Sequence, residues 1–299
     1  MSISLNIDSL WIRKIKNGQQ PSSIELKEHL FAVHKSNPGF TEELAWSCRN
    51  IDGKNSYDLL ADIIEPNKHN KILDLACGSG ILLDLCFKRY GKSINLFGID
   101  MSEDELKLAR EKLTYTNIKL YKCMAQELNF ISKKSIDVIF CHWALTLMDP
   151  VIPVLRNVNR MLGKKGIFAA IIDGDSKKSR VYHEVYKIIY EYVQLEYPKY
   201  GKIEIGDSRI RKMNSLYTLS KEIFVGSTIK IIPHILNLNA SSKELAREVS
   251  GFFYASYVLS SKSHKKMLLE LEDYFISKFK TGCSVYSMPI NLLIIKKNN

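Results

Sequence analysis

The chain has 299 residues, of which 45% are hydrophobic and 25% are charged. This composition is typical of a globular protein and excludes a largely disordered chain. The length exceeds that of a typical single domain, so we expect one large domain or a domain with an additional lid. The net charge of +11 suits nucleic acid, an anionic surface or an acidic substrate, but the lysines occur as scattered pairs, which favours an ordinary solvated surface.

The length of the apolar stretches and the spacing of the cysteines predict the compartment of the protein and whether it binds a metal. The N-terminal segment has no basic stretch leading into an apolar one, and no window has the ~20 uncharged apolar residues of a membrane span. Six cysteines are present without a C-x-x-C pair, so neither a zinc site nor a disulfide framework is predicted. We therefore expect a cytoplasmic protein with reduced cysteines, no membrane span and no metal site.

The N-terminal 70 residues are expected to be largely helical, with a break at Pro38-Gly39 and a further helix that starts at Ser56. From residue 71 onwards, short apolar runs alternate with helical patterns. The runs predict strands over 71–76, 94–100, 118–122, 136–141 and 167–172. Repeated strand–helix–strand units predict an α/β fold with a mostly parallel, doubly wound sheet, whose core we place at residues 71–175.

The C-terminal part, residues 176–299, has a less regular pattern. Helices are expected near 181–197, 208–224, 242–260 and 264–280. Apolar runs over 228–232 and 290–295 predict two further strands. We therefore expect lid helices in this part, together with the last two strands of the core sheet.

The most informative segment spans residues 72–80, where a buried strand runs into a turn with Gly78 and Gly80 and a helix follows. Glycine allows tight backbone angles and close approach of a ligand, at the strand ends where open parallel sheets bind ligands. The dinucleotide pattern G-x-G-x-x-G lacks its third glycine, and no P-loop is present. Asp74 precedes the glycines, and a carboxylate there repels pyrophosphate but suits a positively charged amino-acid group.

A second carboxylate follows at the end of the next strand. Asp100 stands 20 residues after Gly80 and is followed by Met101. A carboxylate at this position can accept hydrogen bonds from both hydroxyls of a ribose, and Met101 can lie against an adenine. Taken alone, each residue is equally well interpreted as a loop carboxylate or a core methionine. Together with the glycine turn they predict a nucleoside site.

These residues resemble the first motif of the class I S-adenosylmethionine-dependent methyltransferases, in which an acidic residue precedes three spaced glycines. Ala76 stands at the first glycine position. The similarity extends over residues 70–172 and is close to the small-molecule branch that includes the ubiquinone, menaquinone and malonyl-carrier methyltransferases. It implies a Rossmann-like sheet of seven strands, S-adenosylmethionine as cofactor and S-adenosylhomocysteine as product.

The resemblance also implies roles for individual residues. The expected cofactor-binding residues are Asp74, Ala76, Cys77, Gly78, Gly80, Asp100, Met101, Ala125, Gln126, Cys141 and Tyr57. Within this set, Ala125 and Gln126 correspond to the segment that recognises the adenine edge. Tyr57 corresponds to the N-terminal cover, formed by residues 1–70, and would contact the methionyl part.

Methyl transfer from a sulfonium is a direct displacement, so a base is needed only when the acceptor must lose a proton. His142, directly after the fourth strand, is the candidate base. The alternative is a histidine that shapes the pocket or holds the backbone. The aromatic segment 252–257 lies where related enzymes place a lid and would favour an apolar or amphipathic acceptor. Its alternative interpretation is a buried helix face.

The sequence thus predicts an enzyme that methylates a small molecule at oxygen, nitrogen or carbon. An RNA or protein methyltransferase is an alternative because of the charge, but the Asn/Asp-Pro-Pro-Tyr/Phe pattern of amino-methylating nucleic-acid enzymes is absent, as is a recognisable RNA-binding module. A non-catalytic S-adenosylmethionine-binding protein is a second alternative. A dehydrogenase is disfavoured by the missing glycine. The sequence determines neither the acceptor nor the oligomeric state.

Overall fold

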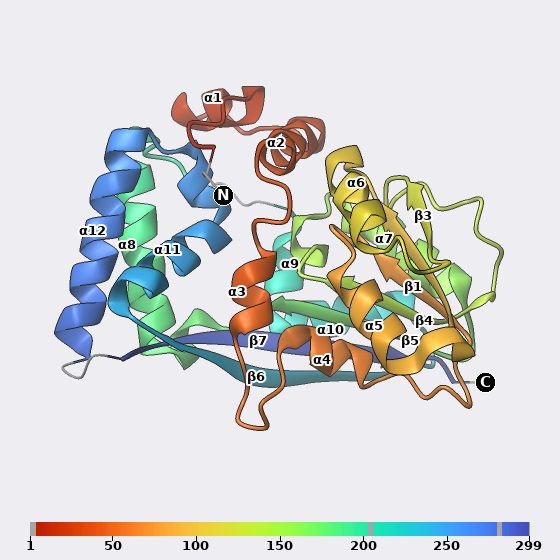
Figure 1. Ribbon diagram of the computed structural model, residues 1–299. Helices are drawn as coiled ribbons and strands as arrows, with labels where there is room; N and C mark the ends of the chain where they lie inside the picture. Colours follow the sequence, from red (N-terminus) through yellow and green to blue (C-terminus); the bar gives the residue numbers. More distant parts are fainter. Residues whose placement is uncertain (1–3, 203–205, 280–282, 299) are drawn as a thin grey trace. The chain divides into compact units, whose positions relative to one another are not determined.

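The computed structural model describes residues 4–202, 206–279 and 283–298 (Figure 1). The chain forms two compact units, each made of three chain segments. The sheet unit comprises Ser56–Asp175, Gly206–His234 and Ile290–Asn299. The helical unit comprises Met1–Asn55, Ser176–Ile205 and Ile235–Pro289. Two long strands near the C-terminus have residues in both units.

Seven strands form one sheet in the order β3-β2-β1-β4-β5-β7-β6. They are β1 (Lys71–Leu75), β2 (Asn95–Asp100), β3 (Lys119–Lys122), β4 (Ile136–His142), β5 (Leu162–Asp173), β6 (Thr228–Ala240) and β7 (Ser284–Lys296). The pairs among β1 to β5 are parallel, and β7 runs antiparallel to β5. This confirms the predicted doubly wound, mostly parallel sheet. The strand order reverses between β1 and β4, and such reversals are where open α/β sheets bind ligands.

Helices cover both faces of the sheet unit, which explains why its central strands are nearly continuous apolar runs. These helices are α4 (Ser56–Ala61), α5 (Ile81–Tyr90), α6 (Glu103–Lys112), α7 (Val151–Met161), α9 (Ser208–Arg211) and α10 (Met213–Ile223). Alternate strand residues such as Leu73 and Ile139 share a core with the apolar sides of α7 and α10. The intervening residues point to the opposite face, where α5 buries Leu82 and Leu83.

The helical unit consists of helices with many aromatic contacts. It contains α1 (Leu10–Lys16), α2 (Ser23–Ser36), α3 (Glu42–Ser47), α8 (Arg180–Glu196), α11 (Ser242–Phe252) and α12 (Ser261–Lys278). Ser22 and Ser241 begin α2 and α11 with reciprocal capping boxes. Within this unit, Tyr186 and Tyr190 of α8 stack with ring centroids 3.9 Å apart. Over the described parts of both units, no helix combines the length and the apolarity needed to cross a membrane.

Several predicted boundaries were wrong. The strands expected over 228–232 and 290–295 extend over Thr228–Ala240 and Ser284–Lys296, because Pro233 and Pro289 interrupt the apolar pattern without ending the strands. A proline is tolerated in β6 because it is an edge strand. In β7, Pro289 precedes Ile290, the first residue paired with β5, so its missing N–H removes no bond from that ladder.

Other boundaries differ because tertiary packing breaks helices that the pattern joins. The helix expected over 208–224 is interrupted at Lys212, which lies between α9 and α10 with extended geometry. The helix expected over 242–260 ends at Phe252 and is followed by a short 3₁₀ segment, Tyr254–Val258. β5 starts at Leu162, five residues earlier than expected, with a register shift opposite β4.

Gly98 offers a test of the packing between β2 and its neighbours. A Cβ there would lie 2.7 Å from both Leu120 Cδ2 and Leu83 Cδ1 and 2.8 Å from Cys77 Sγ. We therefore predict that Gly98→Ala lowers the free energy of unfolding by about 1–3 kcal/mol through overpacking, as measured by urea denaturation. The matched control is Gly163→Ala, whose Cβ would meet no atom closer than 3.5 Å. Equal stability of the two variants would contradict the packing at Gly98.

Candidate functional site

The turn after β1 forms the floor of the candidate site. Three of its residues, Ala76, Gly78 and Gly80, have positive φ angles of 60°, 51° and 81°. This left-handed geometry favours glycine, and Ala76 adopts it at a steric cost. The Cys77 N–H donates to Ile99 O at 2.9 Å, which ties the turn to β2. Gly80 then caps α5, so unpaired main-chain N–H groups of the first helical turn face the end of the sheet.

Asp100, at the end of β2, connects this turn to the next one. Its Oδ2 accepts a hydrogen bond from the Gly78 N–H at 2.9 Å, and its Oδ1 accepts one from the Ser102 N–H at 2.8 Å. The residue is 9% exposed. An ionised carboxylate has about four acceptor positions. Asp100 can therefore hold both loops and still accept a hydrogen bond from a ligand hydroxyl.

Asp74 lies two residues before the turn and is 2% exposed. Within the described residues, no donor lies within hydrogen-bond distance of its buried Oδ1. Burial and the charge of Asp100 raise the pKa of the Asp74 carboxyl well above its usual range. Since buried polar atoms are normally hydrogen-bonded, an orphaned carboxylate oxygen here fits a ligand that brings a donor group. A positively charged amino group would also reduce the repulsion between the two carboxylates.

His142 ends β4, next to β1 in the sheet, and contacts α4. Its Nε2 lies 2.9 Å from Ser56 Oγ, and its ring stacks on Tyr57 with centroids 4.0 Å apart. Burial lowers the pKa of His142 to about 3, so the imidazole is neutral at physiological pH. Tyr57 is 4% exposed. The structure therefore brings Tyr57 and His142 together, as one stacked pair at the carboxyl end of β4.

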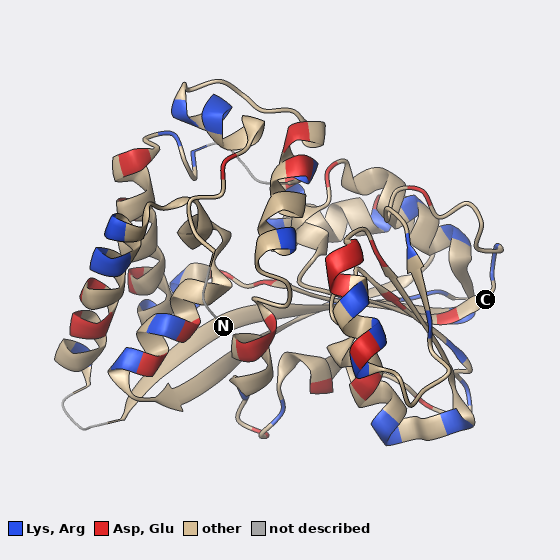
Figure 2. Ribbon diagram, turned by 45° about the horizontal axis from the view of Figure 1, so that its top comes forward, with Lys and Arg blue, Asp and Glu red and all other residues tan. Residues whose placement is uncertain are grey.

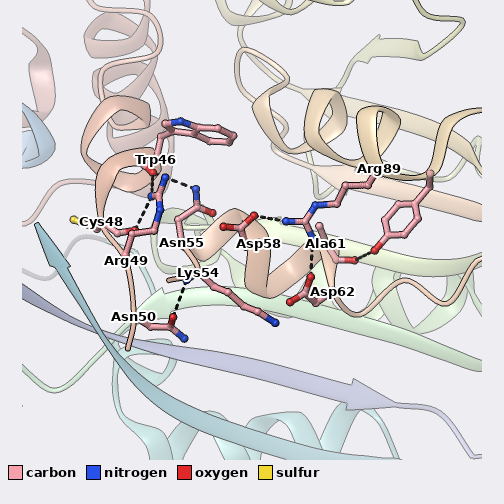
Figure 3. A network of polar contacts seen from close by, with 11 residues as sticks. Trp46, Cys48, Arg49, Asn50, Lys54, Asn55, Asp58, Ala61, Asp62 and Arg89 are labelled. Carbon is pink, nitrogen blue, oxygen red and sulfur yellow. Dashed lines mark hydrogen bonds and ion pairs between the residues drawn. The ribbon is translucent and has the colours of Figure 1, made fainter. Parts of the chain in front are cut away.

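An ion-pair network fixes α4 on α5 (Figure 3). Arg89 of α5 reaches Asp58 of α4 and Asp62 directly after that helix, with 2.7 Å between its Nη1 and Asp62 Oδ1. The Tyr90 hydroxyl donates to Ala61 O at 2.9 Å. These contacts hold the helix that carries Tyr57, although α4 itself has only six residues.

The segment predicted to meet an adenine, Ala125 and Gln126, follows β3 and is anchored by α7. Asn157 Nδ2 donates to Ala125 O at 3.3 Å and to Gln126 O at 2.9 Å. Gln126 Nε2 donates to Pro150 O at 3.4 Å. Sequence reasoning missed Asn157. Its signal was an amide within the apolar side of α7, where Asn157 is 8% exposed.

The two remaining predicted residues occupy different environments. Met101 starts the turn after β2 and is partly buried. Cys141 is wholly buried in the core cluster, and burial raises the pKa of its thiol to about 12. Its side chain is thus part of the packing, and only its main chain is available to a ligand. Sequence reasoning also missed Asp173, the last residue of β5, whose signal was its position at a strand end.

Comparison with known proteins agrees with this geometry. A family model described as a methyltransferase domain matches residues 66–201, a range that holds every predicted cofactor-binding residue except Tyr57. Residues 66–201, rather less than half of the chain, are therefore similar to a methyltransferase domain. The predicted family is thereby confirmed.

The individual relatives of this chain are distant. The demethylmenaquinone methyltransferase of Staphylococcus aureus is 28% identical over 137 residues, which are 46% of this chain and 55% of that protein. The chain thus spans about half the length of the curated relatives it matches.

Similarity to solved structures concerns the fold. A protein of Anabaena variabilis, described as a putative methyltransferase from an antibiotic biosynthesis pathway, matches with a TM-score of 0.58 and 12% identity over 84% of this chain and 98% of that one. The YcgJ protein of Bacillus subtilis matches with a TM-score of 0.53 and 15% identity, over 82% of this chain and 98% of that one.

The orphaned Asp74 carboxyl predicts an unusual pH dependence of stability. Because its pKa is raised in the folded protein, the unfolded chain releases this proton first, and stability decreases as pH rises above the ordinary aspartate range. We predict that Asp74→Asn stabilises the ligand-free protein at pH 7, by about 1.4 kcal/mol for each pH unit by which burial raises the pKa of the Asp74 carboxyl, because the amide does not titrate. Thermal melting at several pH values measures this effect, and the gain should shrink towards pH 3.5.

The control for this measurement is Glu111→Gln, an exposed position on α6 where the same charge is removed. Its melting temperature should stay near that of the parent protein. A loss of stability in Asp74→Asn at neutral pH would show that the carboxylate is satisfied and would contradict the ligand site.

Proposed function

We propose that this chain transfers the methyl group of S-adenosylmethionine to a small acceptor molecule. The observation that carries the proposal is the unpartnered, buried Asp74 oxygen beside the left-handed turn at residues 76–80. A donor with a cationic amino-acid tail supplies both the missing hydrogen bond and the missing charge. The match of residues 66–201 to a methyltransferase domain supports it.

Each part of the cofactor has candidate partners in the sheet unit. Asp74, Gly78 and Gly80, with the main chain of Ala76 and Cys77, would hold the amino-acid part. Asp100 and Met101 would hold the ribose and adenine, and Ala125 and Gln126 the adenine edge. When bound, the cofactor supplies a sulfonium methyl group that is open to displacement. The chain itself binds, orients and excludes water.

Tyr57 and His142 would border the methyl end of the cofactor. The neutral His142 ring can accept a proton, but its low pKa makes it a weak base. Its base role stays a prediction, as does binding through Tyr57. The predicted cover at 1–70, core at 71–175 and lid at 176–299 are likewise proposals, and so is the cytoplasmic location.

An apolar or amphipathic small molecule is the acceptor class we favour. The relative from Staphylococcus aureus is named for a quinone acceptor. The basic surplus does not gather on one element, since Lys or Arg bands and Asp or Glu bands follow each other along the same helices (Figure 2). A protein that binds nucleic acid usually concentrates its charge on one face or stripe.

Calorimetric titration with S-adenosylhomocysteine tests the cofactor site. We predict that Asp100→Ala weakens binding by about 1–3 kcal/mol, the loss of hydrogen bonds to a charged acceptor, which is roughly 5- to 150-fold in Kd. Glu111→Gln should leave the affinity unchanged.

A ligand cycle separates direct contact from loop damage, because Asp100 also holds Gly78 and Ser102. A 2′,3′-dideoxy analogue should bind the parent protein more weakly but lose little further affinity in Asp100→Ala. Full additivity of the two losses would remove Asp100 from the ribose site.

Activity itself is tested by incubating the protein with cell extract and methyl-labelled donor and identifying the labelled product. Saturable donor binding without any labelled product would favour a non-catalytic binding protein.

A further inference from the structure

A second carboxylate, Asp173, lies at the carboxyl edge of the sheet unit, at the end of β5. Its carbonyl oxygen accepts a hydrogen bond from Asn291 Nδ2 of β7 at 3.1 Å. On the other side, the Trp143 N–H donates to Ile171 O of β5 at 2.9 Å. Asn291 of β7 therefore fixes the backbone of Asp173 on one side, and the residue after β4 fixes β5 two residues earlier on the other.

The carboxylate has two partners that leave it largely available. Arg211 Nε lies 3.6 Å from Asp173 Oδ2, beyond the usual range for a hydrogen bond, so it acts mainly as a nearby charge. The side chain of Trp143 also favours the ionised form of the carboxyl and so lowers its pKa. The Asp173 side chain is 34% exposed. Yet its surroundings desolvate it enough to raise its pKa despite these two partners.

Arg211 is held in place by its own helix. Asp207 begins α9 by accepting a hydrogen bond from the Arg209 N–H at 3.0 Å, and Ile210 is wholly buried in the core cluster. Gly206, with φ of 71°, packs so closely on Thr146 that an added Cβ would lie 2.2 Å from its carbonyl oxygen. The segment that carries Arg211 is thus anchored on the loop after β4.

Three aromatic side chains contact one another in a row that starts at α4. Tyr57 stacks on His142, and His142 meets Trp143 edge-on with centroids 5.1 Å apart. Trp143 has φ of 54°, which is rare for a bulky residue and is typical of functional sites. We call Tyr57, His142 and Trp143 the aromatic wall.

We propose that Asp173 is the catalytic carboxylate of an acceptor subsite, which binds the hydroxyl or amine of a molecule with an apolar body lying on the aromatic wall. The proposal rests on the methyltransferase function proposed above. A carboxylate can hold an O–H or N–H group, whereas it offers nothing to a carbon nucleophile without such a proton. The acceptor class is therefore an alcohol, phenol or amine.

The step balances in protons and electrons. The acceptor's oxygen or nitrogen forms a bond to the methyl carbon, and the electron pair of the broken C–S bond stays on sulfur. The acceptor's O–H or N–H proton goes to Asp173, which later releases it to water. Arg211 is a positioning residue, because its charge acts on the carboxylate without contacting the reacting atoms, whereas Trp143 would carry the apolar body of the acceptor.

The titration of Asp173 is measurable without an acceptor. The chain has three tryptophans, so indole-¹⁵N labelling gives three resonances, and Trp143→Phe identifies the one of Trp143. This resonance should shift with pH around a midpoint above the usual aspartate value, and the shift should vanish in Asp173→Asn. Arg211→Met should raise the midpoint further, since a cation is removed.

Other groups near Asp173 do not produce the same signal. Burial lowers the pKa of His142 on β4 to about 3. The neighbouring residue of β7 is the uncharged Asn291. Asp58 on α4 forms an ion pair with Arg89. Asp175→Asn is the matched control, since it removes an exposed carboxylate two residues away and should leave the titration unchanged. A Trp143 resonance that does not titrate, or that titrates equally in Asp173→Asn, would overturn the assignment.

A test of activity uses the acceptor that the experiment with cell extract and labelled methyl donor identifies. Asp173→Asn should lower kcat by 10²-fold or more, in the range for a proton acceptor, while its Kd for S-adenosylhomocysteine changes less than 3-fold. In the parent enzyme, kcat/KM should rise with pH through the same midpoint, and this rise should be absent in Asp173→Asn. Arg211→Met should move the rise to higher pH.

The outcomes separate the two proposals. Absent binding of S-adenosylhomocysteine by the parent protein would contradict the methyltransferase function itself. Intact binding and turnover, with Asp173→Asn as active as Asp175→Asn, would contradict only the acceptor subsite. A labelled product methylated at a carbon without an adjacent O–H or N–H group would also overturn it.

Discussion

Two buried carboxylates at the ends of neighbouring strands dominate the electrostatics of the sheet unit. Asp74 and Asp100 are each at most 9% exposed, and their like charges raise the cost of ionising both. Their surroundings differ, since two main-chain N–H groups satisfy Asp100 and Asp74 Oδ1 has no donor. The folded chain therefore holds an arrangement that protonation of Asp74 relieves and that a cationic ligand would relieve. Such local destabilisation is expected where binding, rather than stability, constrains the residue.

Short-range patterns predicted the centre of the fold well. β1, the glycine turn and α5 form one continuous segment, and each part has its own local signal, namely an apolar run, left-handed glycines and a capped helix. The outer elements were less predictable because their boundaries depend on partners far along the chain. Pro233 is compatible with a strand only because β6 lies at the sheet edge, and edge position is not visible in the sequence.

The same distinction applies to the site. Asp74 and Asp100 were predictable because each stands at a fixed place relative to the glycine turn. Asn157 was missed because it acts on Ala125 and Gln126, which are more than 30 residues away. Asp173 was missed for the same reason, since Arg211 comes near its carboxylate only once α9 has packed on the loop after β4. Contacts of this kind are set by sheet register and helix docking, which no local motif encodes.

Burial has opposite effects on the pKa values of the two candidate proton acceptors, His142 and Asp173, at the carboxyl ends of β4 and β5. A poorly solvated environment disfavours whichever form is charged, so it lowers the pKa of His142 and raises that of Asp173. Proton transfer is most effective when the pKa of the base lies near the working pH. The surroundings that make the imidazole a poor base therefore make the carboxylate a better one. His142 then has a different physical role, because a neutral ring held by Ser56 and stacked on Tyr57 gives the aromatic wall a fixed surface. On the proposed function, the strand ends would have separate roles, with β1 and β2 holding the methyl donor, β4 shaping the acceptor subsite and β5 receiving the proton.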